Sequence, residues 1–498
     1  MVLPLADRLL AAVLVSLAAA ALIAASGRWP HLREAWTFAA AVLKLALVAS
    51  LLPAVLAGEI VETTPLALVP GLALHLRADP LGLLFALVAS GLWLLTSVYS
   101  VGYMRGGHYK NQTGYFASFA VCVSATIGIA FAANLVTFFV FYEILTIATY
   151  PLVIHSRTPD ALRSGRAYLA YTLIAGQALL VATVWAQWLA PGASFQPGGF
   201  LPSGVPGTWL LFVLFMVGVG VKAGIMPLHG WLPAAMVAPT PVSALLHAVA
   251  VVKAGAFGCL RIVGFVFGVD LMREVGADVV LAVAASLTII LASIRALGEG
   301  HLKRRLAYST IGQLSYIVLG AALGSTAALA GAIFHIAAHG VMKITMFFCA
   351  GAIYVRTHLD QIKDLDGVGR RMPITMGAFA LCALALAGLP LLAGFVSKWN
   401  LGIGAVHAGY PLFVGVLIAS GVLNFAYFFP IVYAAFFGRG GQAGLTFEDN
   451  GPAMTAPLAI TAVLALVLGL FPDAGFSLYE LAWQAASSVT AASAGGAP

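Results

Sequence analysis

Long hydrophobic runs separated by short polar loops repeat along almost the whole chain. A helix that crosses a bilayer needs about 20 apolar residues. The runs show no alternation of apolar and polar residues, which excludes a transmembrane β-barrel. The pattern predicts an all-α integral membrane protein with fourteen spanning helices in a single polytopic domain (1–498). The predicted spans cover residues 6–26, 36–57, 80–104, 114–132, 134–154, 166–190, 206–226, 240–265, 277–297, 304–324, 327–354, 372–396, 409–437 and 453–471, and the segment 453–498 is the last helix with a short tail.

The composition agrees with a chain that is mostly buried in lipid. Only 9% of the 498 residues are charged, against about 25% in a soluble domain. Hydrophobic residues make up 61%, and the mean hydropathy is +1.00. These values exclude a soluble multidomain enzyme, a disordered protein and a secreted disulfide scaffold. The cysteines are isolated in apolar runs without metal-ligand spacing, so we expect neither a metal site nor a cofactor in this chain. They are Cys122, Cys259, Cys349 and Cys382.

The basic residues of the loops fall mostly on one side of the predicted membrane. With fourteen spans, sixteen lie on one side and four on the other. Cytoplasmic loops carry the excess of Lys and Arg, so both termini are expected outside the cytoplasm. This topology also explains the net charge of +7 better than nucleic-acid binding does. The first run resembles a signal peptide, but Arg28 and Arg33 follow it, which favours a retained helix.

Two apolar segments are predicted to be broken helices. The segment 218–241 reads GVGVKAGIMPLHGWLPAAMVAPTP, and the segment 388–410 reads GLPLLAGFVSKWNLGIGAVHAGY. Proline removes a helical hydrogen bond, and the freed backbone groups persist in a membrane only where protein or a water-filled cavity satisfies them. These segments correspond to the seventh and twelfth spans, which we expect to be interrupted.

The two breaks suggest an internal repeat. Pro227 and Pro390 are separated by 163 residues, which pairs the fourth to eighth spans with the ninth to thirteenth. A unit of five helices is odd in number, so two copies would be inverted in the membrane. The sequence therefore predicts two inverted repeats at 114–265 and 274–437.

Several lysines lie inside the predicted spans or beside the breaks. A charged residue at a helix centre costs about 2.5–3.5 kcal/mol on insertion scales. Lys44 lies toward the cytoplasmic half of its span, where snorkelling to the interface is an even alternative. For the other lysines a hydrated ion pathway is favoured over structural pairing. They are Lys222, Lys253, Lys343 and Lys398.

Glu143 is the only carboxylate well inside a span, in the run FFVFYEILTIATYP. Alone in lipid it would be protonated, and a lysine partner would keep it ionised. A static buried ion pair is the alternative interpretation, and such a pair often stabilises little. The excess of lysines over acids favours a chain of titrating groups, since an apolar environment favours neutral lysine and such lysines can pass protons.

A stripe of titratable residues follows one predicted helix. His335, His339 and Lys343 are spaced i, i+4, i+8, which keeps them near one helix face over a rise of about 12 Å. Histidine titrates near neutrality and relays protons. His247 and Lys253 are six residues apart and do not share a face closely, but both can line one polar axis between helices. The pattern predicts a proton relay.

Several long motifs in this order resemble the antiporter-like membrane subunits shared by Mrp-type multisubunit cation/proton antiporters, respiratory complex I and membrane-bound hydrogenases. The resemblance spans roughly residues 80–440. It is carried by VKAGIMPLHGWLPAAMVAPTPVSALLHAVAVVKAG, KRRLAYSTIGQLSYIVLG, FHIAAHGVMKITMFFCAG and GLPLLAGFVSKWN. The resemblance implies fourteen transmembrane helices with two inverted five-helix repeats, and the D subunit of Mrp-type antiporters is the most natural match.

The resemblance also implies roles for individual residues. Glu143 on the fifth helix matches a glutamate that pairs with a lysine on the seventh, here Lys222. Lys253 on the eighth helix, with His247 beside it, matches the next proton-transfer position. The remaining matches are the histidines of the eleventh helix, His335 and His339, and the terminal residue of the axis on the twelfth helix, Lys398.

These observations predict a proton-translocating subunit of a multisubunit sodium/proton antiporter in the inner (plasma) membrane of a bacterium or archaeon. The expected partners are other membrane subunits, protons, possible Na⁺ and the lipid bilayer. The alternative is a proton-pumping membrane subunit of a complex I-like NADH:quinone oxidoreductase or a membrane-bound hydrogenase. In that case any redox chemistry belongs to partner subunits, because this chain shows no flavin, iron–sulfur or dinucleotide motif. A third interpretation is a scaffold with static ion pairs.

Overall fold

The computed structural model describes residues 3–69, 71–438 and 448–494. Within these residues, twelve helices are long and apolar enough to cross a membrane. They are α1 (Leu5–Ala25), α2 (Pro30–Ala49) continued by α3 (Leu52–Leu56), α4 (Pro80–Gly106), α5 (Gln112–Ala130), α6 (Leu135–Val153), α7 (Pro159–Leu189), the segment Thr240–Phe267, α13 (Ala277–Gly298), α14 (Leu302–Leu323), α15 (Thr326–Thr357), α19 (Leu412–Phe437) and α20 (Pro452–Leu470). Arg439, one of the loop cations, and the end of the predicted 453–498 segment lie outside the described residues.

Two further apolar helices are too short to cross a bilayer alone. They are α8 (Thr208–Ala223) and α17 (Pro373–Ala387). Each is followed, after an interruption, by a second helix, α9 (Trp231–Ala234) or α18 (Ala393–His407). With the twelve longer helices they account for the fourteen predicted spans. The predicted all-α membrane fold with interrupted seventh and twelfth spans is therefore confirmed.

The first interruption has its freed backbone groups satisfied inside the protein. The indole Nε1 of Trp231 donates to the carbonyl of Val221 at 2.8 Å. The N–H of Ile225 donates to the carbonyl of Gly220 at 3.0 Å. Unpaired backbone groups are costly in a bilayer, so these bonds allow α8 to end at membrane depth.

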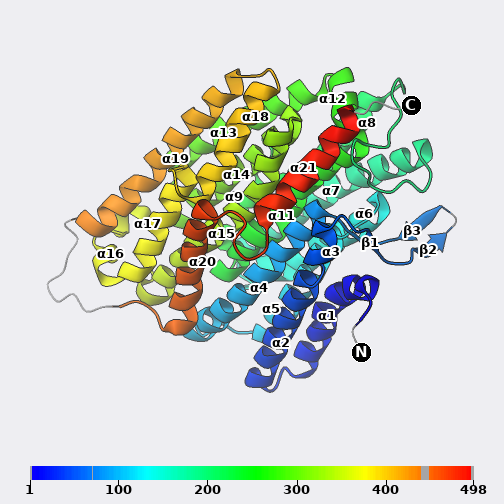
Figure 1. The fold of residues 1–498 in the computed structure, drawn as a ribbon. Helices are drawn as coiled ribbons and strands as arrows, with labels where there is room; N and C mark the ends of the chain where they lie inside the picture. The colour runs from blue at the N-terminus through cyan, green and yellow to red at the C-terminus, as the bar shows by residue number, and fades with distance from the viewer. Residues whose placement is uncertain (1–2, 70, 439–447, 495–498) are drawn as a thin grey trace.

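The helix α15 lies at the centre of the bundle (Figure 1). Its most hydrophobic window is fully buried within the protein, and so is that of the Thr240–Phe267 segment. That segment consists of α10 (Thr240–Ala244), the π-helix η2 (Leu245–Val249), α11 (Val251–Arg261) and the π-helix η3 (Ile262–Phe267). Because neighbouring helices cover these two segments, their polar side chains are shielded from lipid.

The tail after the last span forms a helix, α21 (Leu478–Ala494), which the sequence analysis described only as a short tail. Buried apolar residues at helical spacing, among them Leu478, Leu481 and Ala485, face the bundle. The helix packs against α15 and α4 and lies across the bundle (Figure 1). It therefore covers the central helix rather than hanging free of the domain.

The connection between α3 and α4 contains two small antiparallel sheets that the hydrophobic pattern did not predict. The pairs are β1 with β4, in register Val61↔Ala78, and β2 with β3, in register Leu66↔Leu74. The strands are β1 (Val61–Glu62), β2 (Leu66–Val69), β3 (Leu72–Leu74) and β4 (Arg77–Ala78). The remaining short elements are η1 (Ala235–Val237), α12 (Val269–Glu274), η4 (Ile362–Asp364) and α16 (Val368–Arg371).

A buried ion pair ties α4 to α11 at one end of the bundle. Asp79 caps the N-terminus of α4 by accepting from the Gly82 N–H at 2.7 Å. Its carboxylate also accepts from both terminal nitrogens of Arg261, at 2.5 and 2.7 Å. Burial raises the pKa of Asp79, but Arg261 and the Gly82 N–H outweigh it, so the net shift is downward. The carboxylate is ionised and fixes these two helices together.

Candidate functional site

The first predicted group, on α6 and α8, consists of Glu143 and Lys222. Lys222 is buried, and its Nζ donates to the backbone carbonyl of Tyr142 at 2.7 Å and lies 3.4 Å from the centre of that ring. Among the described residues, Glu143 forms no direct ion pair, and its Oε1 is buried without a hydrogen-bond partner. The two side chains are thus neighbours around Tyr142, without the direct contact that the resemblance implied.

A close approach of two helices places Lys222 beside α11. A Cβ atom at Gly255 would lie 2.2 Å from the backbone nitrogen of Ala223 and 2.8 Å from the Cβ of Lys222. Only glycine permits this contact. Gly255 lies two residues after Lys253, so the packing brings the second predicted lysine onto the helix adjacent to the first.

The structure joins Lys253 to the histidine pair of α15. The Nζ of Lys253 is 2.8 Å from the Nδ1 of His339, and both side chains are fully buried. The ring of His339 stacks on that of His335 with centroids 5.7 Å apart. His335 Nδ1 in turn lies 2.7 Å from the Oγ of Ser397 on α18. These contacts form a continuous polar row from α11 across α15 to α18.

His247 lies on the π-helix η2, close to this row. Its ring is 5.1 Å from that of Phe347 on α15, and both of its nitrogens are buried without a protein partner among the described residues. A π-helix within an α-helical segment is frequent at functional sites. A buried polar group without a protein partner is typically satisfied by water, so the surroundings of His247 suit a hydrated segment.

Lys343 points away from the histidines, although all three share α15. Its Nζ donates to the Oγ of Ser309 on α14 at 2.7 Å and lies 5.2 Å from the ring centre of Phe428 on α19. The predicted stripe on one helix therefore divides in space. His335 and His339 contact α11 and α18, whereas Lys343 contacts α14 and α19.

Lys398 binds the backbone of the second interruption. Its Nζ donates to the carbonyls of Leu386 and Ala387, at 2.5 and 3.3 Å, at the end of α17. It also lies 5.0 Å from the ring centre of Tyr316. The helix break frees these carbonyls, since no further turn follows to donate to them. The lysine that follows the break in sequence thus returns to satisfy it.

Lys44 does not snorkel. Its side chain is fully buried between the first helices of the bundle, and its Nζ has no hydrogen-bond partner among the described residues. The nearest aromatic ring that receives it is that of Trp93, at 5.6 Å. The sequence placed snorkelling and burial on equal terms, because it does not show which face of α2 is covered by α4.

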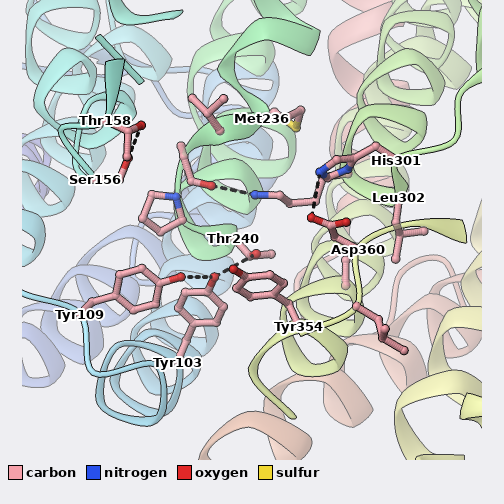
Figure 2. Close-up of a pocket in the computed structure, with 16 residues that line it drawn as sticks. Tyr103, Tyr109, Ser156, Thr158, Met236, Thr240, His301, Leu302, Tyr354 and Asp360 are labelled. Carbon is pink, nitrogen blue, oxygen red and sulfur yellow. Dashed lines mark hydrogen bonds and ion pairs between the residues drawn. The ribbon is translucent and has the colours of Figure 1, made fainter. Parts of the chain in front are cut away.

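A cavity of about 360 Å³ opens between the ends of α4, α14 and α15 (Figure 2). Lys303 donates to the carbonyl of Ala238 at 2.8 Å, and His301 lies 3.6 Å from Asp360. Tyr103 joins Tyr109 and Thr240 in a row of hydroxyls, at 3.0 and 3.3 Å. Thr240 begins the helical segment that carries His247 and Lys253. The cavity is therefore a polar opening at the start of a central helix.

His301 lies at the rim of this cavity, before the first residue of α14. Burial lowers the pKa of its imidazole, and the neighbouring carboxylates of Asp360 and Glu299 oppose this only in part. The cations Lys303 and Arg304 lower it further. His301 is accordingly neutral at pH 7.

The structure adds hydroxyl and amide groups that the sequence analysis did not select. Ser309, Ser397, Tyr427 and Asn424 contact the predicted lysines or histidines directly or through one another. Asn424 is a polar residue in the long apolar run GVLNFAYFF, a signal that was available. Serine and tyrosine are common in apolar helices, so their presence alone carried no signal.

Residues 132–424 match the family described as NADH:quinone oxidoreductase/Mrp antiporter, TM. NADH-quinone oxidoreductase subunit N of Desulforudis audaxviator is 33% identical, over 83% of this chain and 86% of the relative. A probable K(+)/H(+) antiporter protein of Rhizobium meliloti, its A/B subunit, is 31% identical over 81% of this chain, which spans only 40% of that relative. A chain in the structure of the Mrp complex from Dietzia sp. DQ12-45-1b has the same fold, with a TM-score of 0.86, 23% identity and 98% of both chains covered. The chain belongs to this family of antiporter-like, multi-pass membrane proteins.

Proposed function

We propose that the chain is the proton-translocating subunit of a multisubunit monovalent cation (Na⁺)/proton antiporter. Protons move along a central axis whose transfer groups are Glu143, Lys222, Lys253 and Lys398 and whose relay groups are His247, His335, His339 and Lys343. The likeness to named subunits of larger assemblies supports partners that are other membrane subunits.

One observation carries the proposal. The four central lysines are buried, and each donates to a neutral acceptor: Tyr142 carbonyl, His339 Nδ1, Ser309 Oγ or Leu386 carbonyl. Among the described residues, none of them forms an ion pair with a carboxylate. A lysine that serves structure alone would be paired, since an unneutralised charge at membrane depth costs free energy. A lysine that gains and loses a proton requires an acceptor that tolerates both states.

The orientation in the membrane belongs to the same proposal. The uneven distribution of loop cations supports placing both termini outside the cytoplasm of a bacterial or archaeal cell. The polar cavity beside Lys303 then faces the cytoplasm. The two interruptions support inverted repeats at 114–265 and 274–437, one break in each unit.

The test is proton transport by the assembled complex in everted vesicles. We expect Glu143→Ala and Lys222→Ala each to abolish cation-dependent proton movement, because each removes a transfer group from the axis. The matched control is Lys363→Ala, which removes an exposed loop lysine of the same charge. Copurification of the partner subunits must be unchanged in all three variants. Near-normal transport by both axis variants would refute the proposal.

A redox-driven assembly is the second candidate, and one observation favours it. The chain spans 86% of the NADH-quinone oxidoreductase relative, but only 40% of the antiporter relative. In this case the same axis would be driven by electron transfer in partner subunits. Purification of the native complex and measurement of its iron content separates the two. Stoichiometric iron–sulfur clusters would favour the redox assembly, and their absence from an intact, transporting complex would favour the antiporter.

A further inference from the structure

Lys343 and Lys398 are connected by a second set of contacts that avoids the histidines. Lys343 Nζ donates to Ser309 Oγ at 2.7 Å, and Ser309 Oγ lies 3.0 Å from the hydroxyl of Tyr427. The hydroxyl of Tyr427 also contacts the Oδ1 of Asn424, one helical turn away on α19. All of these side chains are buried. They extend from α15 through α14 to α19.

The last contact of this set is a shared backbone carbonyl. The Nδ2 of Asn424 donates to the carbonyl of Leu386 at 3.3 Å, and the same oxygen accepts from Lys398 Nζ at 2.5 Å. Leu386 is the second-last residue of α17, where the break frees the carbonyl. The amide of Asn424 and the ammonium of Lys398 therefore compete for one acceptor.

The hydroxyls of this set have two consistent orientations. A charged lysine is a donor only, so when Lys343 is protonated Ser309 accepts from it and donates to Tyr427. Tyr427 has a single hydroxyl proton and then donates to Asn424. When Lys343 is neutral, its amine accepts from Ser309, and Tyr427 turns its proton toward Ser309 and away from Asn424. Only O–H rotations separate the two states, and no covalent bond breaks.

We propose that Ser309, Tyr427 and Asn424 are positioning residues that couple the charge on Lys343 to the charge on Lys398. This inference rests on the proposed function, in which both lysines change protonation. A proton on Lys343 fixes Asn424 against Leu386 and weakens the binding of a second ammonium there. Loss of that proton releases Asn424 and leaves the Leu386 carbonyl to Lys398. The link makes occupation of the two lysines by protons alternate.

The two ends of the link have few other titratable neighbours. Lys253 and Cys382 act electrostatically on Lys343, and Tyr316 and Arg305 act on Tyr427. Arg305 donates to the backbone carbonyl of Tyr427 at 2.8 Å, so it does not compete for the hydroxyl. The Lys398 end faces the ring of Tyr316 and the imidazole of His335. The hydroxyl of Tyr316 is bound by Ser420 at 2.7 Å and takes no part in the link.

The test is Tyr427→Phe in the assembled complex, which removes one hydroxyl and keeps the buried ring. We expect a roughly fivefold to tenfold fall in proton transport, the size typical of a coupling free energy between two sites. We also expect a broader pH profile, because the two lysines then titrate independently. Ser309→Ala should show the same defect, and the double variant should be no worse than either single one. Ser309→Thr keeps the hydroxyl and should retain wild-type transport.

Tyr99→Phe is the matched control, because its buried hydroxyl donates to the Phe348 carbonyl at 2.6 Å outside the link. It should leave both the transport rate and the pH profile unchanged. Wild-type transport and pH profile in Tyr427→Phe would overturn the inference, and so would additive defects in the Ser309→Ala/Tyr427→Phe double variant.

Lys343→Ala and Lys398→Ala separate this outcome from failure of the proposed function. If both abolish transport while Tyr427→Phe does not alter it, only the link is wrong. If both retain transport, the proton axis itself is wrong.

Discussion

The two interrupted helices satisfy their freed backbone in different ways. At the end of α8 the carbonyl of Val221 accepts from the indole N–H of Trp231, a donor that is always neutral. The adjacent Lys222 takes no part and donates instead to the Tyr142 carbonyl. At the end of α17 the carbonyls of Leu386 and Ala387 accept from the ammonium of Lys398 itself.

This difference separates two kinds of buried lysine. The backbone of the first break is satisfied whatever the charge on Lys222, so that lysine is free to exchange protons without a local structural cost. At the second break the ammonium is part of what satisfies the backbone. Protonation of Lys398 is therefore linked to the structure of the α17–α18 junction, and each site responds differently to loss of its side chain.

The largest expected effect comes from replacing the two lysines by methionine. Under the proposed function, Lys222→Met and Lys398→Met both abolish proton transport. They should differ in stability, because Lys398→Met leaves the Ala387 carbonyl without the donor found in the structure. The Tyr142 carbonyl still accepts from Thr146 at 3.1 Å after Lys222→Met. We expect Lys398→Met to be less stable by about 1–3 kcal/mol, the cost of an unsatisfied buried acceptor.

Unfolding of the two purified variants in the same detergent measures that difference. Equal stability would show that the ammonium contributes nothing to the second break, and the distinction between the two lysines would be lost.

Removal of the neutral donor at the first break should have a smaller, purely structural effect. Trp231→Phe deletes the N–H that binds Val221, and we expect a loss of about 1–3 kcal/mol in the free energy of unfolding. Trp93→Phe is the matched control, because the Trp93 ring is fully buried and its Nε1 has no partner among the described residues. If the two variants lose the same stability, the indole bond is not what supports the end of α8.

The smallest expected effect concerns the glycine that ends α17. Gly388 has φ +96°, and a Cβ there would lie 3.0 Å from the Cδ of Lys398. We expect Gly388→Ala to cost about 1–2 kcal/mol, since L residues disfavour a left-handed backbone, and to reduce transport by displacing Lys398. Gly377→Ala lies in the same helix with open space around its Cβ and should be neutral or slightly stabilising. A thermal melt of each variant compares them, and equal melting temperatures would contradict the strain at Gly388.

Much of the fold and part of the site followed from the sequence alone. Run length predicted the spans, and Pro and Gly within a run predicted both interruptions, because each has a local physical cause. Buried lysines and histidines were visible as candidates, because a titratable group in an apolar run has no cheap structural role. The helical tail α21 and the strands of 61–78 were missed, since neither forms a long apolar run.

Only the tertiary structure decided which polar groups meet. Lys343 shares a helix with His335 and His339, yet it contacts Ser309 on another helix. Lys44 is covered, and Glu143 makes no direct contact with Lys222, neither of which spacing along the chain could establish. Periodicity shows which residues share a helix face, but the rotation of each helix against its neighbours is set by packing. That packing determines which hydroxyl, carbonyl or imidazole each buried lysine finds.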